Sequence, residues 1–107
     1  MALAFDAFSS GSALPGTSVT FAHTCTGDNR ILIVGVIKNG NTNDTITGVT
    51  YATIALTNAG SIGSSATLRV YLWFLINPAT GANDIVVTNS ASENTRCVAT
   101  SYTGAKQ

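Results

Sequence analysis

The stretch Ile31-Leu32-Ile33-Val34-Gly35-Val36-Ile37 decides the fold, because it is the most apolar run in the chain. Its β-branched side chains are stiff at χ1 and fit the pleated surface of a strand better than a helix. Polar residues do not alternate with the apolar ones, so we expect a strand in the middle of a sheet with both faces covered. The run is too short to span a membrane, which takes about 20 apolar residues.

The composition predicts a single domain, residues 1–107, with an unusually uncharged surface. Hydrophobic residues make up 45% of the chain and charged residues only 9%, against about 25% charged in typical domains. The formal net charge is zero and the Lys and Arg residues are scattered, whereas phosphate backbones are held by clustered basic side chains. The sequence therefore argues against nucleic acid as a partner, and a near-neutral surface favours association with other subunits.

The start of the chain, Met-Ala-Leu-Ala-Phe-Asp, has neither the basic segment nor the long apolar segment of a signal peptide. We expect a protein that stays where it is made or leaves inside an assembled particle, although a fragment of a larger secreted protein would look the same. The cysteines are Cys25 and Cys97. A disulfide between them would close a loop of about 70 residues and stabilise by about 4 kcal/mol. Thiols stay free in the reducing cytosol, so both states remain open.

Short strands separated by turn signals account for the whole chain, and no segment has a helical period. The expected strands are Leu3–Phe8, Thr17–Thr24, Ile31–Ile37, Thr45–Tyr51, Ile54–Thr57, Leu68–Ile76, Ile85–Thr88 and Arg96–Thr103. About eight strands with turns roughly every 8–12 residues are typical of an antiparallel β-sandwich. A jelly roll and an immunoglobulin-like Greek key both fit this pattern.

Two hairpins are predicted from local sequence. Thr17–Thr24 is expected to pair with Arg30–Ile37 across a short turn. Thr45–Tyr51 is expected to pair with Ile54–Thr57 across Ala52-Thr53, a bend that lacks the Gly or Asn such turns prefer. The intervening loops and turns are expected at Ser9–Gly16, Asn39–Asp44, Asn58–Ala66, Gly81–Asp84 and Asn89–Asn94.

The strand Leu68–Ile76 carries the candidate contact residues. Its even-numbered side chains are all apolar, so this face is predicted to be core. The other face bears Arg69, Tyr71 and Trp73, which could be a stacking platform for sugar rings, a subunit interface, or the second side of a buried strand. Aromatic residues and Arg are enriched in interfaces, which supports the second of these.

No residues form a recognisable catalytic or metal site, so we expect no enzyme, no cofactor and no metal. His23 is the only histidine, and a general base would need a nucleophile and a carboxylate beside it. We expect an inward-facing or rim histidine that hydrogen-bonds a backbone carbonyl. The five acidic residues are spread along the chain, which argues against a hydrolase on a jelly-roll scaffold.

Several motifs resemble a series that recurs in β-sandwich domains of phage virion proteins and large bacterial surface proteins. They are His23-Thr24-Cys25-Thr26-Gly27, the run from Asn29 to Val36, Gly48-Val49-Thr50-Tyr51, Ile54-Ala55-Leu56-Thr57, Leu72 to Gly81, Ile85-Val86-Val87-Thr88 and Ser101-Tyr102-Thr103-Gly104. The resemblance covers most of the chain from Thr17 to Gly104, and its motifs are strands and turns. Two departures are Ala52-Thr53, where a glycine-rich turn is expected, and the end at Gln107, where related domains often continue. The resemblance implies an exposed display or decoration domain without catalytic residues.

The leading hypothesis from the sequence is a non-enzymatic structural protein of a phage. It would be a capsid decoration or cement protein, or a fibre or tail module, made in the host cytoplasm and located in the virion. Its partners would be other virion proteins and further copies of itself, with a trimer favoured. The alternative is a carbohydrate-binding or adhesin module on a bacterial cell surface, with a glycan as partner. Neither hypothesis involves nucleic acid or a membrane.

Overall fold

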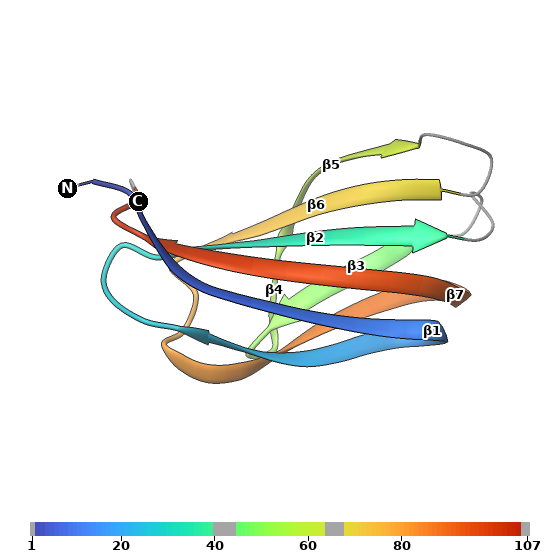
Figure 1. Ribbon diagram of the computed structural model, residues 1–107, viewed down its shortest axis with the longest axis horizontal. Coiled ribbons are helices and arrows are strands. Elements are labelled where there is room, and N and C mark those ends of the chain that lie inside the picture. The colour runs from blue at the N-terminus through green and yellow to red at the C-terminus, as the bar shows by residue number, and fades with distance from the viewer. Residues whose placement is uncertain (1, 40–44, 64–67, 106–107) are drawn as a thin grey trace.

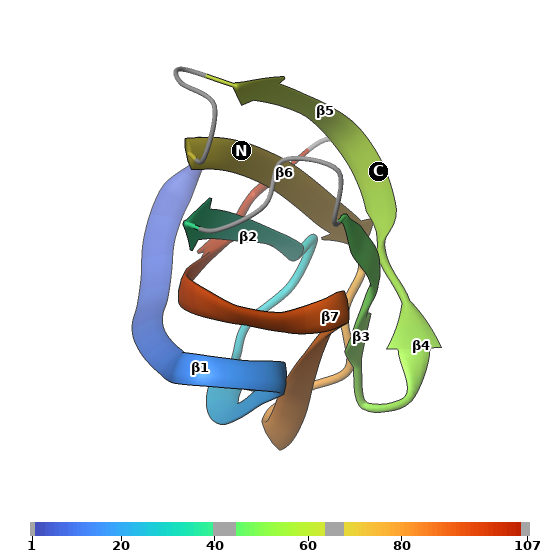
Figure 2. The same ribbon diagram turned by 90° about the vertical axis from the view of Figure 1, so that its right-hand side faces the viewer.

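The structure is a computed structural model that describes residues 2–39, 45–63 and 68–105. It is a nearly closed, antiparallel sheet of seven strands, and the described residues contain no helix (Figures 1 and 2). The strands are β1 (Ala4–Cys25), β2 (Ile31–Asn39), β3 (Ile46–Tyr51), β4 (Ile54–Ala55), β5 (Thr57–Gly63), β6 (Leu68–Ile76) and β7 (Gly81–Thr103). The order across the sheet is β4-β3-β7-β2-β6-β5, and β1 pairs with β7 outside this path. The predicted all-β antiparallel class is confirmed.

The two longest strands, β1 and β7, form one bent ribbon. Residues 4–13 of β1 pair with residues 95–103 of β7, and residues 18–25 of β1 pair with residues 81–88. Shifts in register on both sides of Gly16 mark the bend between these halves. The nearly closed sheet thus has two opposite walls. The N-terminal half of β1 and the C-terminal half of β7 belong to one wall, and the C-terminal half of β1 and the N-terminal half of β7 belong to the other (Figure 2).

This ribbon corrects three sequence predictions. Ser9–Gly16 and Gly81–Asp84 were expected to be a loop and a turn, yet they lie within β1 and β7. The expected turn Asn89–Asn94 also lies within β7, and Asn89 stabilises the bend, because its Nδ2 donates to the Gly16 carbonyl at 3.0 Å and to Thr95 Oγ1 at 2.8 Å. Long-range pairing thus overrides the turn preference of Ser, Gly and Asn here. Two expected pairs of strands merge into single strands, which is one reason why the described residues form seven strands rather than the expected eight.

The predicted hairpin between Thr17–Thr24 and Arg30–Ile37 is wrong. Residues 18–25 pair with β7, whereas β2 pairs with β6 on one side and with β7 on the other. The turn after Cys25 therefore leads from one wall of the sheet to another. β6 and β7 occupy both edges of β2, so β2 has no free edge for the local hairpin.

The strand β2 lies between β6 and β7, so its predicted central position is confirmed. Leu32, Val34 and Val36 on its inner side are fully buried. The prediction that both sides are covered is wrong, because Ile37 on the outer side is 44% exposed and Ile33 is only half-buried. The described strands enclose the inner side of β2, and no described strand packs over the outer side, which faces solvent.

The chain beyond β3 agrees with the prediction at one hairpin and differs after it. The hairpin of β3 and β4 is confirmed, with Thr50 opposite Ala55 and Tyr51 opposite Ile54. The expected Asn58–Ala66 loop is wrong over residues 58–63, which belong to β5 and pair with β6. Residues 64–66 of that loop and residues 40–44 of the expected Asn39–Asp44 turn lie outside the described residues.

The bend of the β3–β4 hairpin is strained and can be improved. Ala52 and Thr53 have φ angles of 51° and 68°, a conformation that Asn and Gly adopt readily and that a β-branched residue resists. We expect the double substitution Ala52→Asn and Thr53→Gly to raise the free energy of unfolding by about 1 kcal/mol. Thermal unfolding would then move up by about 4–8 °C. A midpoint that stays the same or falls would contradict this account of the turn.

Candidate functional site

The two faces of β6 are the reverse of the sequence prediction. Tyr71 is 5% exposed and Trp73 is 9% exposed, because each lies opposite a buried residue of β2 in the register of the sheet. The apolar even-numbered side chains, predicted to be core, point outward, and Leu72 is 47% exposed. The structure therefore places the candidate residues Arg69, Tyr71 and Trp73 on the inner side of the sheet.

The inner position of these residues has an energetic cost. Within the described residues, Arg69 Nε, the Tyr71 hydroxyl and Trp73 Nε1 are buried without a hydrogen-bond partner. A buried polar atom without a partner costs about 1–3 kcal/mol relative to water. The burial of their large apolar surfaces outweighs that cost, and neither aromatic ring is available to stack on a sugar.

The most unusual feature of the molecular surface is a broad apolar face, which we call the outer face. We use this name for the outward side of β5, β6, β2, the C-terminal half of β7 and the N-terminal half of β1, which lie side by side in Figure 1. Almost all of the exposed large apolar side chains lie on it: Leu3, Phe5, Phe8, Leu14, Ile37, Ile62, Val70, Leu72, Ile76 and Val98. Among the described residues, Arg96 is the single charged residue of this face.

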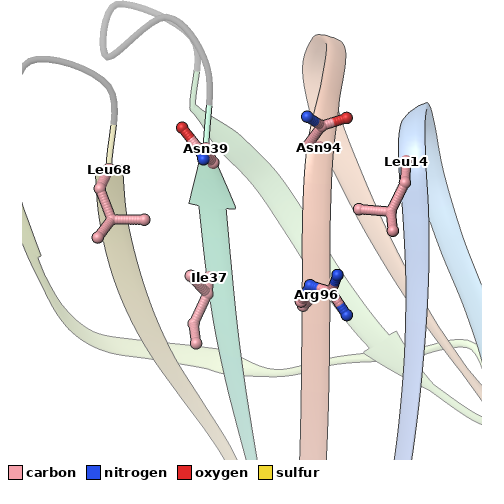
Figure 3. A pocket seen from close by; sticks show the side chains of 6 residues that line it. All are labelled: Leu14, Ile37, Asn39, Leu68, Asn94 and Arg96. Atoms are coloured by element: carbon pink, nitrogen blue, oxygen red, sulfur yellow. The ribbon is translucent and has the colours of Figure 1, made fainter.

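Arg96 lies in a shallow hollow of about 200 Å³ at one end of the outer face. Figure 3 shows Leu68 from β6, Ile37 and Asn39 from β2, Asn94 and Arg96 from β7, and Leu14 from β1 around it. The guanidinium group makes no hydrogen bond or ion pair within the described residues. Apolar walls with one cation and two amides suit an apolar partner that brings an electron-rich group to this end.

The other end of the outer face is apolar and aromatic. Leu3, Ile31, Ile33 and Tyr102 line a second, more open hollow there. The ring of Phe5 lies edge-on to the ring of Tyr102 with centroids 6.0 Å apart. Arg96 and Tyr102 are on the same strand and point the same way, so β7 carries a cation at one end of the face and an aromatic pair at the other.

A buried hydrogen-bond network surrounds the only histidine, His23. Ser101 Oγ donates to Asp6 Oδ2 at 2.8 Å, and its one proton is thereby used. Ser101 must then accept from His23 Nε2, at 2.9 Å, which leaves His23 Nδ1 to accept from the Ser9 hydroxyl at 2.6 Å. The network links residues 14 and 78 positions apart in the sequence, and it corrects the expectation that His23 bonds a backbone carbonyl.

The network is suited to hold the fold together. A serine, a histidine and a carboxylate joined by hydrogen bonds also occur in hydrolases, but His23 is only 2% exposed, so a substrate cannot approach its ring. The network joins both halves of β1 to β7 through polar side chains. Asp6 further accepts from the backbone and side chain of Thr26, which ties the turn after β1 to the start of the same strand.

Protonation of His23 should make stability depend on pH. Burial lowers the pKa of His23, although the nearby charge of Asp6 opposes this. The unfolded chain therefore takes up a proton near pH 6.5 that the folded chain still refuses, so the free energy of unfolding should fall between pH 7 and pH 5, by at most about 1.4 kcal/mol per pH unit.

Asp6 should not contribute in this window. Burial opposes its charged form, but hydrogen bonds from Thr26 and Ser101 outweigh this and lower its pKa below 3.8, so its stabilisation is complete above that pH. Urea titrations at both pH values measure the effect, with His23→Asn as the control that flattens it. Equal stability of the original chain at pH 7 and pH 5 would contradict the sign.

The two cysteines are free and buried in the structure, on the inner side of the sheet. Burial raises the pKa of Cys97 to about 12 and also raises that of Cys25. Both thiols are therefore protonated at neutral pH and react slowly. The possible disulfide is not formed in this structure.

Comparison with protein-family models, with curated proteins and with solved structures found no match to this chain. Within the described residues no group of His, Cys, Asp or Glu side chains could hold a metal ion. The part of the chain that the structure describes also has no helix long and apolar enough to cross a membrane. By its geometry, the outer face is the strongest candidate for a functional site. Sequence reasoning missed it, although the absence of polar residues on either side of β2 and on the even side of β6 was a signal for it.

Proposed function

We propose that the chain is a non-enzymatic structural protein of a phage particle, acting as a capsid decoration or cement protein or as a fibre or tail module. The outer face is the observation that carries this proposal. A monomer seldom exposes an apolar patch of more than about 300–600 Å², and this face extends over five strands of the sheet. Burying it between subunits provides the free energy of assembly.

Three further features support the proposal. The surface is poor in charge, which favours close packing of subunits. The motifs from Thr17 to Gly104 resemble those of virion display domains. The fold also suits this role: we interpret the nearly closed sheet as a β-sandwich, because its core lies between two walls joined by the bent β1–β7 ribbon. The protein would be made in the host cytoplasm and located in the virion.

The carbohydrate-binding alternative loses the observation on which it was based. It needs exposed aromatic rings on the odd-numbered side of β6, and Tyr71 and Trp73 are buried there. The same burial moves the proposed contact face from these residues to the opposite side of β6. A bacterial surface adhesin that works through stacked sugars is therefore not the function we propose.

Immunogold labelling tests the location that we propose. Antibodies raised against the purified chain should label virus particles isolated from the sample in which the sequence occurs, and the label should take a regular position on the particle. Particles stripped with denaturant should lose it. Labelling confined to host cells or to free protein would overturn the proposal.

A further inference from the structure

We propose that the outer face binds the outer face of a second copy of this chain. A two-fold axis relates the two copies; it lies between their sheets and runs perpendicular to the strands. The proposal rests on the proposed function, since it names the first partner in the assembly. It replaces the trimer favoured from the sequence by a pair with both outer faces buried against each other. A two-fold interface uses the same patch on both copies, so the patch must be complementary to itself.

The exposed area is sufficient for such a pair. A fully exposed large residue offers on the order of 200 Å², so the fractions exposed on the outer face correspond to at most roughly 1,000 Å² of apolar surface. A stable interface buries about 800 Å² on each partner. The face therefore has the size of one complete dimer interface.

The charge distribution identifies the partner as apolar and nearly uncharged. Apart from Arg96, the outer face in the described residues has no charged side chain. A partner with several charges would lose their hydration against this surface without gaining ion pairs in return. A second copy of the outer face meets the requirement, because it is equally apolar.

Arg96 also decides how the two copies are oriented. An axis parallel to the strands would bring both Arg96 residues to the same end of the interface, where like charges repel. An axis across the strands reverses one sheet, and the two Arg96 residues are then separated by about 20 Å, six residues along a strand. In this arrangement the Arg96 of each copy lies over the aromatic end of the other, where the guanidinium group can contact the rings of Tyr102 and Phe5.

The solution mass and two charge substitutions test the pair. Light scattering over a concentration series should give twice the chain mass at high concentration. Val98→Glu lies within the face and should weaken association by at least about 100-fold, because it buries a carboxylate in an otherwise apolar interface. Ile54→Glu is the matched control, since Ile54 is 56% exposed but lies on β4, outside the face, and it should leave association unchanged. If circular dichroism shows that Val98→Glu is unfolded, Leu72→Glu takes its place.

Crosslinking tests the orientation separately. A chain with Arg96→Cys mixed with a chain with Tyr102→Cys should be joined efficiently by a short bismaleimide, whereas Arg96→Cys alone should not be. Efficient crosslinking of Arg96→Cys to itself would overturn the proposed axis. A single-chain mass at every concentration, a three-chain mass, or association that survives Val98→Glu and Leu72→Glu would overturn the pair. Immunogold labelling of particles does not depend on these results, so a failure of the pair is distinguishable from a failure of the virion function.

Discussion

Replacing Trp73 with alanine is expected to lower the free energy of unfolding by about 3–5 kcal/mol, the range observed when a large buried aromatic side chain is removed. Replacing its neighbour Leu72 with alanine should cost less than about 1 kcal/mol in the isolated chain, because Leu72 is 47% exposed. The two residues are adjacent on β6 and point to opposite sides of the sheet. The difference between them measures which side of β6 forms the core.

Urea unfolding at low protein concentration gives both values, because association then adds little to the apparent stability. The even-side core predicted from the sequence gives the opposite order, with Leu72→Ala the more damaging substitution. That order would place the even-numbered side of β6 in the core, and it would remove the outer face as a candidate site.

Replacing Gly11 with valine should lower the free energy of unfolding by about 2–3 kcal/mol, at the upper end of the cost of overpacking a core. A Cβ atom at Gly11 would lie 2.9 Å from the Cβ and Cγ of Phe21, so the backbone rather than a flexible side-chain end would have to move. Gly11 and Phe21 belong to different halves of β1. They meet only because the strand bends and folds back across the core.

A second substitution shows whether the contact with Phe21 causes the loss of stability in Gly11→Val. Phe21→Ala removes the Cγ and the ring and should relieve part of the penalty in the Gly11→Val background, so the double variant should be more stable than the sum of the two single effects predicts. Gly48→Val is the control, since a Cβ there meets no atom within 4 Å, and it should cost much less. Additive effects of Gly11→Val and Phe21→Ala would mean that the two halves of β1 do not face each other.

The regular strands could be predicted from the sequence, because alternation and β-branched residues identify them directly. The central position of β2, the ends of β6 and the β3–β4 hairpin all follow from local signals. The alternation of β6 also separates its two faces correctly. It does not say which face is buried, because both carry large apolar side chains. Hydrophobicity alone favours the even-numbered face, whereas the odd-numbered face with its aromatic rings fills the core.

The bent ribbon and the histidine network could not be predicted for a different reason. Residues 9–16 are rich in Ser and Gly, which usually indicate a loop, and only their pairing with β7 makes them a strand. Ser9, Ser101 and Asp6 are ordinary residues in the sequence, and their role appears only when distant strands bring them to His23. Long-range pairing determines both features, and a single sequence carries little information about it.

The most direct test of the outer face as a contact surface is the rate at which a thiol reagent labels a Leu72→Cys variant, measured below and above the concentration at which the chain associates. Cys25 and Cys97 are buried and add little background. We predict fast labelling in dilute solution, where position 72 is exposed, and labelling slower by at least about tenfold once association is nearly complete. A rate that stays the same at every concentration would contradict the account.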